Sequence, residues 1–352
     1  MPPKRRGRKR KARPSDEGEC ESRLLQPDPG NEVQRIGSRG GSVPSGSPTI
    51  TLEYLQRTTI GLMQNSLAFN TFQTYNTAVS SFSKFRSMYK FEEHWPATQQ
   101  QLVLFIAYCF NKGLSPKSIK TYIAGLDYFH RVNEWPPVTS NFLIAKLLDG
   151  CFRVRKTVDN RAPITKHILL GILNELHRVC YNQYEIKLFK SLWLLAYFGL
   201  FRISELVACY AYGPNYNINR GDIYISPDGH FVSVSLNRHK TNQCSKATVL
   251  KLALEQDKNA CPVTALISYI NVRPDIEGSL FCHADGKPVL RHQFSFLLDK
   301  CIVRAGFNRG KYTSHSFRIG RATDLASMGM PSCLIKKMGR WSSDAYKTYI
   351  RV

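Results

Sequence analysis

The chain has 352 residues, which is enough for two ordinary domains. Apolar residues make up 43% and charged residues 21%, a globular composition that excludes a wholly disordered protein. Lys and Arg total 49 against 26 Asp and Glu, and the resulting charge of +23 favours a polyanionic partner. The longest apolar run, near Phe189 to Phe201, is too short to cross a bilayer, and no secretory leader follows the N-terminus. We therefore expect a protein of the cell interior with no membrane partner.

A basic run opens the chain. From Lys4 to Arg13, eight of ten residues are Lys or Arg. Such a run is a solvated, disordered charge tract, and it also suits a nuclear-import signal that touches phosphates. Residues 14–50 are rich in Gly, Ser, Pro and Glu and lack periodicity, as flexible linkers do. We expect residues 1–50 to be a disordered basic tail and linker, and the protein to reside in the nucleus.

Apolar residues at helical spacing predict a helical domain over residues 51–155. Phe72, Val79 and Phe82 belong to one such stripe, and a second run follows Pro96. Ser115 and Pro116 then provide an N-cap and a first-turn proline for a helix that continues to about residue 131. A fourth helix is expected over about 139–153. Four or five helices with short connections make a compact all-α domain.

A polar stretch, residues 156–163, predicts a linker to a second domain over residues 164–352. Helical patterns resume at Thr165 and over about 184–207. The period then changes to two, which predicts strands at 222–226, around Val232 to Leu236, and in ATVLKLAL. Further helices are expected at about 262–271, 293–305, 315–328, 331–338 and 344–350. The predicted fold class is mainly α (α+β), with one small antiparallel sheet in the second domain.

Signatures of several enzyme classes are missing from the sequence. There is no GxxxxGK[ST] phosphate loop, no HExxH metal pair and no GxSxG elbow. The ten cysteines form no CxxC pair, and most stand in apolar runs like small core residues. We therefore expect no cofactor and no metal.

Six residues from separate stretches form the candidate catalytic set. They are Arg202 in FGLFRISELV, Lys240 in NRHKTNQ, His315 and Arg318 in TSHSFRIG, and Trp341 and Tyr349 in GRWSSDAYKTYIR. In this order they resemble the tyrosine recombinase (phage integrase) superfamily. HSFRIGRATDLASMGMPSCLIKKMGRWSSDAYKTYIR is similar to the C-terminal box of that family. LLAYFGLFRISELVAC resembles its first box, with Glu205 as the acidic companion. The likeness covers about residues 55–352, because the first domain resembles the family's SAM-like core-binding domain.

These residue types suit cleavage of a DNA phosphodiester without a metal. Two guanidiniums, Arg202 and Arg318, can clamp the non-bridging oxygens and bind the charge that grows in the transition state. A tyrosine hydroxyl ionises only near pH 10 in water, so a nucleophile such as Tyr349 needs cations and a proton acceptor nearby. Trp341 has an indole N–H that can hold a phosphate oxygen.

The remaining roles are what the resemblance implies. His315 would accept or shuttle the proton, Lys240 would protonate the leaving 5′ oxygen, and Glu205 would hold its neighbours in place. Tyr349 would form a covalent 3′-phosphotyrosine, which conserves bond energy and permits strand exchange without ATP. The implied activity is site-specific DNA recombination or integration, as in a eukaryotic mobile-element recombinase. Double-stranded DNA and a homo-tetramer assembled on it are the implied partners, with the coupling of protomers left open.

Some alternatives stay open in the sequence. Tyr346 lies one turn before Tyr349 and competes for the role of nucleophile. A catalytically silent, domesticated DNA-binding protein and a type IB topoisomerase would carry similar residues. In the first domain, four basic residues are candidate DNA contacts, although a solvated helix face explains them equally well: Lys84, Arg86, Lys117 and Lys120.

Overall fold

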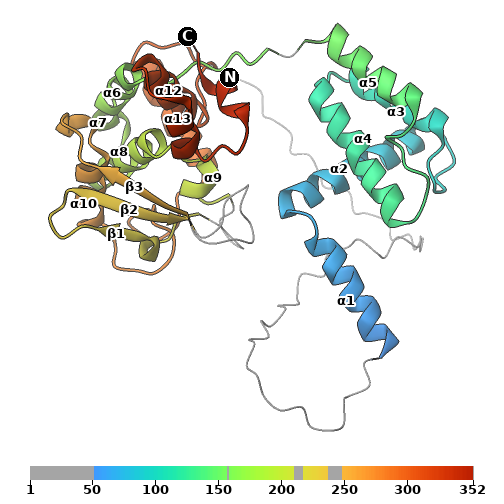
Figure 1. Cartoon of the computed structure of the whole chain (residues 1–352), viewed down its shortest axis with the longest axis horizontal. Helices are drawn as coiled ribbons and strands as arrows, with labels where there is room; N and C mark the ends of the chain where they lie inside the picture. The colour runs from blue at the N-terminus through green and yellow to red at the C-terminus, as the bar shows by residue number, and fades with distance from the viewer. Residues whose placement is uncertain (1–50, 157, 210–216, 237–247, 352) are drawn as a thin grey trace, which may run out of the picture. The chain divides into compact units, whose positions relative to one another are not determined.

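The computed structural model describes residues 51–156, 158–209, 217–236 and 248–351 (Figure 1). The described chain forms two compact units, which separate between Val158 and Asp159. The fold class predicted from the sequence is confirmed, because helices dominate both units and the described residues of the second unit contain one small sheet. No helix in the described ranges is both long and apolar enough to cross a membrane.

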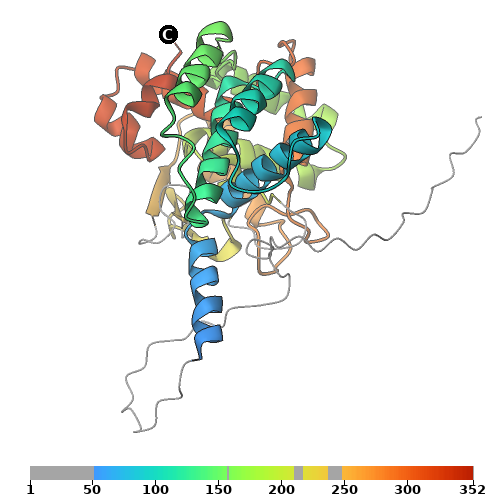
Figure 2. The ribbon, with the colours of Figure 1, turned by 90° about the vertical axis from the view of Figure 1, so that its right-hand side faces the viewer.

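The first unit consists of helices, as the apolar spacing predicts. Their bounds are α1 Leu52–Asn65, α2 Phe69–Met88, α3 Gln99–Asn111, α4 Pro116–Val132 and α5 Phe142–Val154. The predicted cap of α4 is present, because the Ser115 side chain accepts a hydrogen bond from the Ser118 amide at 3.1 Å. Aromatic and aliphatic side chains of α2 to α5, among them Phe82 and Phe105, form the core. Helix α1 extends away from the other four (Figures 1 and 2).

The second unit is built around the apolar helix α8. Its helices are α6 Lys166–Asn174, α7 Leu176–Val179, α8 Gln183–Phe198, α9 Ile203–Leu206, α10 Pro262–Ile270, α11 Arg291–Arg304, α12 Ser316–Ser327 and α13 Ser332–Gly339. Shorter 3-10 segments are η2 Arg220–Asp222, η3 Lys258–Ala260 and η4 Asp344–Tyr349. Trp193 of α8 is fully buried among side chains from α6, α11 and α12. Between Leu188 and Phe198 every residue of α8 except Lys190 is buried, so this part of the helix is apolar on nearly all sides.

The antiparallel sheet has the order β1–β2–β3, with β1 Ile223–Ile225, β2 Phe231–Leu236 and β3 Thr248–Ala253. Val234 in the central strand lies opposite Ile223 on one side and Leu250 on the other. Val232, Val234 and Leu236 are buried while the residues between them are partly exposed, which confirms the alternation seen in the sequence.

Two predicted helices differ from what the structure contains. The helix expected over 184–207 ends at Phe198, and the chain turns through Leu200, whose φ is +49°, before α9 begins. The last expected helix, at 344–350, is the 3-10 segment η4. A hydrophobic period of three to four residues does not separate an α-helix from a broken or tighter one.

Candidate active site

The turn between α8 and α9 places Arg202 at the start of a helix. Arg202 is the N-cap residue of α9, and its backbone N–H donates to Glu205 Oε2 at 2.8 Å. Its Nη1 also donates to Glu205 Oε1 at 3.0 Å. The helix break therefore has a chemical consequence, because it brings the guanidinium and the carboxylate of one short segment together.

Glu205 holds a second arginine that sequence analysis missed. Arg340 Nη2 donates to Glu205 Oε2 at 2.7 Å, and the carboxylate is only 3% exposed. The guanidinium of Arg340 also bonds the carbonyls of Gly199 and Leu200, both at 3.3 Å. Burial, followed by the nearby Arg202, lowers the pKa of Arg340, whereas Glu205 opposes this shift. The Glu205 carboxylate thus connects the start of α9 to the end of α13.

The backbone at Arg340 sends two neighbouring side chains to different parts of the site. Arg340 ends α13 in the left-handed conformation, with φ +55°. Its side chain turns to Glu205, while the next residue, Trp341, packs against Gly339. A Cβ at Gly339 would lie 1.8 Å from Trp341 Cζ3, so only glycine leaves room for the ring. A signal for Arg340 was present in the sequence, since it stands directly before the tryptophan in GRW.

Arg318, on α12, is the most deeply buried cation of the site, with 1% exposure. Nη1 donates to the Leu200 carbonyl and Nη2 donates to the Gly339 carbonyl at 3.1 Å. Its Nε is buried and has no hydrogen-bond partner within the described chain. Burial first, and then Arg202 and Arg340, lowers the pKa of Arg318 to about 10, which still leaves the group charged at neutral pH.

The ring of Tyr349 lies among three predicted site residues. Its centroid is 4.7 Å from that of His315 and 4.9 Å from that of Trp341, and Arg318 Cζ lies 5.5 Å from it. The Tyr349 carbonyl accepts a hydrogen bond from Thr323 Oγ1 at 3.4 Å, which ties the end of η4 to α12.

Tyr346 is more deeply buried than Tyr349, although both belong to one apolar cluster. It is buried at 5% exposure in a small apolar cluster with Leu200, Leu325 and Ile335. Tyr349 is only half-buried and faces the histidine and the arginine. This difference favours Tyr349 as the reactive phenol and assigns a packing function to Tyr346.

His315 immediately precedes α12 and is held in its neutral form. Burial, followed by the positive charges of Arg161 and Arg318, lowers the pKa of His315 to about 4. A neutral imidazole at physiological pH can accept a proton. Arg161 is the second residue that sequence analysis missed, because a single arginine in a polar linker carries no signal of its own.

The structure brings the predicted residues of the second unit together, with one exception. Arg202, Glu205, His315, Arg318, Trp341 and Tyr349 converge from the α8–α9 turn, α12, α13 and η4. Lys240 lies outside the described residues, as does the basic run of residues 4–13. Within the described ranges, no group of three or more His, Cys, Asp or Glu is placed to hold a metal ion.

The basic candidates of the first unit divide into two kinds. Lys84, Lys117 and Lys120 are exposed, so they stay predictions as DNA contacts. The prediction is wrong for Arg86, which is 1% exposed: its Nη1 donates to the His94 carbonyl at 2.8 Å, and its guanidinium lies 4.6 Å from the Trp95 ring. These contacts give the Arg86 guanidinium a role inside the first unit, where it stabilises the fold.

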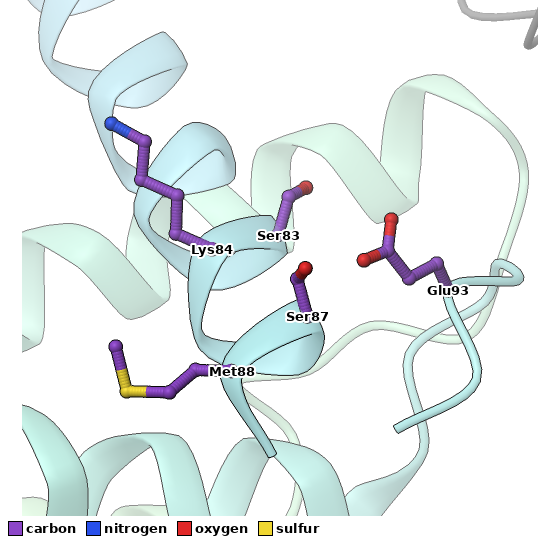
Figure 3. A pocket seen from close by; sticks show the side chains of 5 residues that line it. All are labelled: Ser83, Lys84, Ser87, Met88 and Glu93. Carbon is purple, nitrogen blue, oxygen red and sulfur yellow. The ribbon is translucent and has the colours of Figure 1, made fainter. Parts of the chain in front are cut away.

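Lys84 borders a shallow hollow of about 640 Å³, lined by Ser83, Lys84, Ser87, Met88 and Glu93 (Figure 3). The Glu93 carboxylate lies on the opposite side of this hollow from Lys84 (Figure 3). One charge of each sign gives the hollow no preference for an anion. It is therefore not a phosphate pocket, and the Lys84 side chain alone remains the candidate contact.

Comparison with known proteins identifies the family of the chain. The model of the Phage integrase family matches residues 168–351, and that of the Phage integrase, N-terminal SAM-like domain matches residues 59–135. No sequence among the curated proteins matches the chain.

Solved structures of DNA complexes share the fold. The XerH site-specific recombinase bound to difH substrate is 15% identical, with 85% of this chain and 81% of that chain covered and a TM-score of 0.58. The Tn1549 transposon integrase in complex with transposon right end DNA is 16% identical, with 85% and 94% covered and a TM-score of 0.58. A lambda integrase dimer bound to a COC′ core site is 14% identical, with 85% and 76% covered and a TM-score of 0.57. Because the first family model spans more than half of the sequence, the chain belongs to the phage integrase family.

Proposed function

We propose that this protein is a tyrosine recombinase, which breaks and rejoins DNA strands through a 3′-phosphotyrosine on Tyr349. The observation that carries the proposal is the convergence of buried guanidiniums, a neutral imidazole and a half-buried phenol from four separate segments. Cations held by the fold before substrate arrives stabilise a phosphoryl-transfer transition state without reorganisation.

The proposed step is an in-line transfer of the phosphoryl group. The Tyr349 oxygen attacks the scissile phosphorus, and His315 accepts the phenolic proton. The bond between phosphorus and the 5′ oxygen breaks, and the leaving oxygen takes a proton that the resemblance assigns to Lys240. The guanidiniums of Arg318 and Arg202 stabilise the negative charge that develops on the non-bridging oxygens.

The covalent bond to tyrosine makes the step reversible. A phosphate ester replaces a phosphate ester, so a 5′ hydroxyl from another strand can attack the phosphotyrosine and release Tyr349. No external energy source enters this balance. Exchange of strands between two sites, giving integration or another recombination product, follows from repeating the step.

Structural relatives support a proposal for the substrate and the assembly. XerH is seen bound to its difH substrate, and a lambda integrase tetramer is seen bound to a Holliday junction. By analogy we propose double-stranded DNA as the substrate of this chain, and a homo-tetramer as the form that exchanges strands. A nuclear location is proposed from the basic run of residues 4–13, and localisation of a fluorescent fusion lacking that run tests it.

Covalent trapping on DNA tests the proposed chemistry. A nicked substrate that loses its 5′ hydroxyl fragment after cleavage should accumulate a protein–DNA adduct. We expect Tyr349→Phe to abolish the adduct and the matched variant Tyr346→Phe to retain it, because Tyr346 is buried in an apolar cluster. An adduct that survives in Tyr349→Phe and disappears in Tyr346→Phe would show that the wrong phenol was assigned. Tight DNA binding without any adduct in the wild type would refute the proposed activity.

A further inference from the structure

The opening residues of the second unit run along the start of α12. The Ala162 amide donates to the Lys311 carbonyl at 2.7 Å, and the Ile164 amide donates to the Ser316 carbonyl at 2.9 Å. Gly320 of α12 permits this contact, since a Cβ there would lie 1.7 Å from the Ile164 oxygen. The segment is therefore fixed against the helix that carries Arg318 and directly follows His315.

Asp159 connects this opening segment to the end of the chain. Its carboxylate accepts hydrogen bonds from Arg161 Nε at 2.7 Å and Arg161 Nη2 at 2.9 Å. Arg351 Nη2 donates to the same carboxylate at 2.8 Å. The pKa of Asp159 is held far below its usual range, chiefly by the hydrogen bond from Arg161, so the carboxylate is ionised at neutral pH.

Arg351 follows Tyr349 by two residues and fixes the segment that carries it. The Arg351 amide donates to Thr323 Oγ1 at 3.0 Å, and its guanidinium reaches back to the Thr348 carbonyl. The Tyr349 segment is thus held from two sides, by Thr323 on α12 and by Asp159 from the opening segment. Loss of either anchor would free the reactive phenol to move.

Arg161 lies beside the Tyr349 segment, because it shares the Asp159 carboxylate with Arg351, which follows Tyr349 by two residues. Its charge is close enough to His315 to lower the pKa of the imidazole, and the Tyr349 oxygen is close enough to contribute, after Asp159, to a raised pKa of Arg161. Nε and Nη2 of Arg161 both donate to the Asp159 carboxylate. Two arginines around one aspartate leave a net positive charge beside Tyr349.

We propose that Asp159 is a positioning residue, which fixes the Tyr349 segment through Arg351 and presents Arg161 to the DNA phosphate at the Tyr349 hydroxyl. Arg161 then supplies a guanidinium in addition to Arg202 and Arg318. The inference rests on the proposed function and deepens it, because it names a further phosphate contact of the same site.

Rates of adduct formation test the two roles. We expect Asp159→Asn, which keeps the shape of the side chain, to slow adduct formation about tenfold or more. Arg161→Gln should slow it similarly, and DNA affinity should stay within about twofold because one contact among many is lost. Asp159→Glu, which retains the charge, should recover part of the rate. The matched control is Asp299→Asn, which removes a similarly exposed carboxylate paired with Arg309 far from the site.

A second substrate separates phosphate contact from mere structure. With a methylphosphonate at the scissile position, one negative charge is missing, so the penalty for Arg161→Gln should shrink relative to the normal phosphate. Equal penalties on both substrates overturn Arg161 as a phosphate contact. Rates for Asp159→Asn that match those of Asp299→Asn overturn the positioning role. If the wild type itself forms no adduct, the proposed function fails, whereas a wild-type adduct with unaffected variants refutes this inference alone.

Discussion

Replacing Glu205 with glutamine tests whether one buried carboxylate holds the cations of the site in place. The wild-type carboxylate accepts three hydrogen bonds, two from Arg202 and one from Arg340. Glutamine has nearly the same shape but carries no charge, and its amide nitrogen cannot accept a hydrogen bond. Glu205→Gln therefore leaves two arginines near Arg318 without the counter-charge that the fold provides.

The expected cost follows from the burial of each partner. Removing one member of a buried ion pair destabilises a protein by about 3–5 kcal/mol, because the other charge stays buried and uncompensated. The Arg202 side chain is 20% exposed and can regain water, whereas the Arg340 side chain is 5% exposed and cannot. The lower end of the range, about 3 kcal/mol, is therefore expected. For a unit of this size, each kcal/mol lowers the melting temperature by about 2–4 °C, which gives a fall of about 6–12 °C.

Thermal unfolding in a buffer free of phosphate and sulfate measures this change. Glu185→Gln is the matched control, because Glu185 also lies in the first turn of a helix and accepts a backbone hydrogen bond at 3.3 Å, but is partly exposed. Its melting temperature should change by no more than about 2 °C. Added sulfate should restore part of the stability of Glu205→Gln, since an anion that binds only the folded state stabilises it. A melting temperature equal to that of the control would refute the view that Glu205 compensates the buried arginines.

Two further predictions concern packing and protonation. Gly320→Ala should lower the free energy of unfolding by about 1–3 kcal/mol, because the new Cβ would lie 1.7 Å from the Ile164 carbonyl oxygen. The control Gly171→Ala, whose Cβ would have its nearest neighbour at 3.5 Å, should be neutral or stabilising. Equal melting temperatures of the two variants would contradict this prediction. His315 must be neutral to accept a proton, and its pKa of about 4 keeps it neutral well below its ordinary range. The rate of adduct formation at limiting DNA should therefore stay level down to about pH 5 and fall only near pH 4. An acidic limb near pH 6.5 would show that the imidazole is not held in this way.

Local sequence patterns predicted the structure correctly where the deciding contacts are between residues close in sequence. The Ser115 cap lies next to the residues it serves, and the alternation in β2 reports burial directly. Arg202 and Arg318 could be named because their order and settings resemble a known family, and the structure places both at one site. Motif order along a chain thus carried more information about the site than any single residue did.

The residues that sequence analysis missed or misplaced depend on contacts between distant segments. Arg340 meets Glu205 across more than a hundred residues, and only the left-handed turn at the end of α13 aims it there. Arg161 gains its place because the opening segment docks on α12. Arg86 has the spacing of an exposed helix residue, but the loop carrying His94 folds over it. Periodicity cannot report burial that a separate loop provides.

The site is assembled on backbone carbonyls as well as on side chains, which explains how its cations can be fixed before DNA arrives. Arg318 holds the carbonyls of Leu200 and Gly339, and Arg340 holds those of Gly199 and Leu200. The same bonds that close α8 against α13 therefore aim the guanidiniums. Glu205 balances one of these positive charges, so an excess of positive charge remains buried. The apolar core of the second unit offsets the resulting cost in stability. In the proposed reaction, a scissile phosphate brings the missing negative charge, and because that charge grows during attack, the arrangement would favour the transition state over the bound substrate.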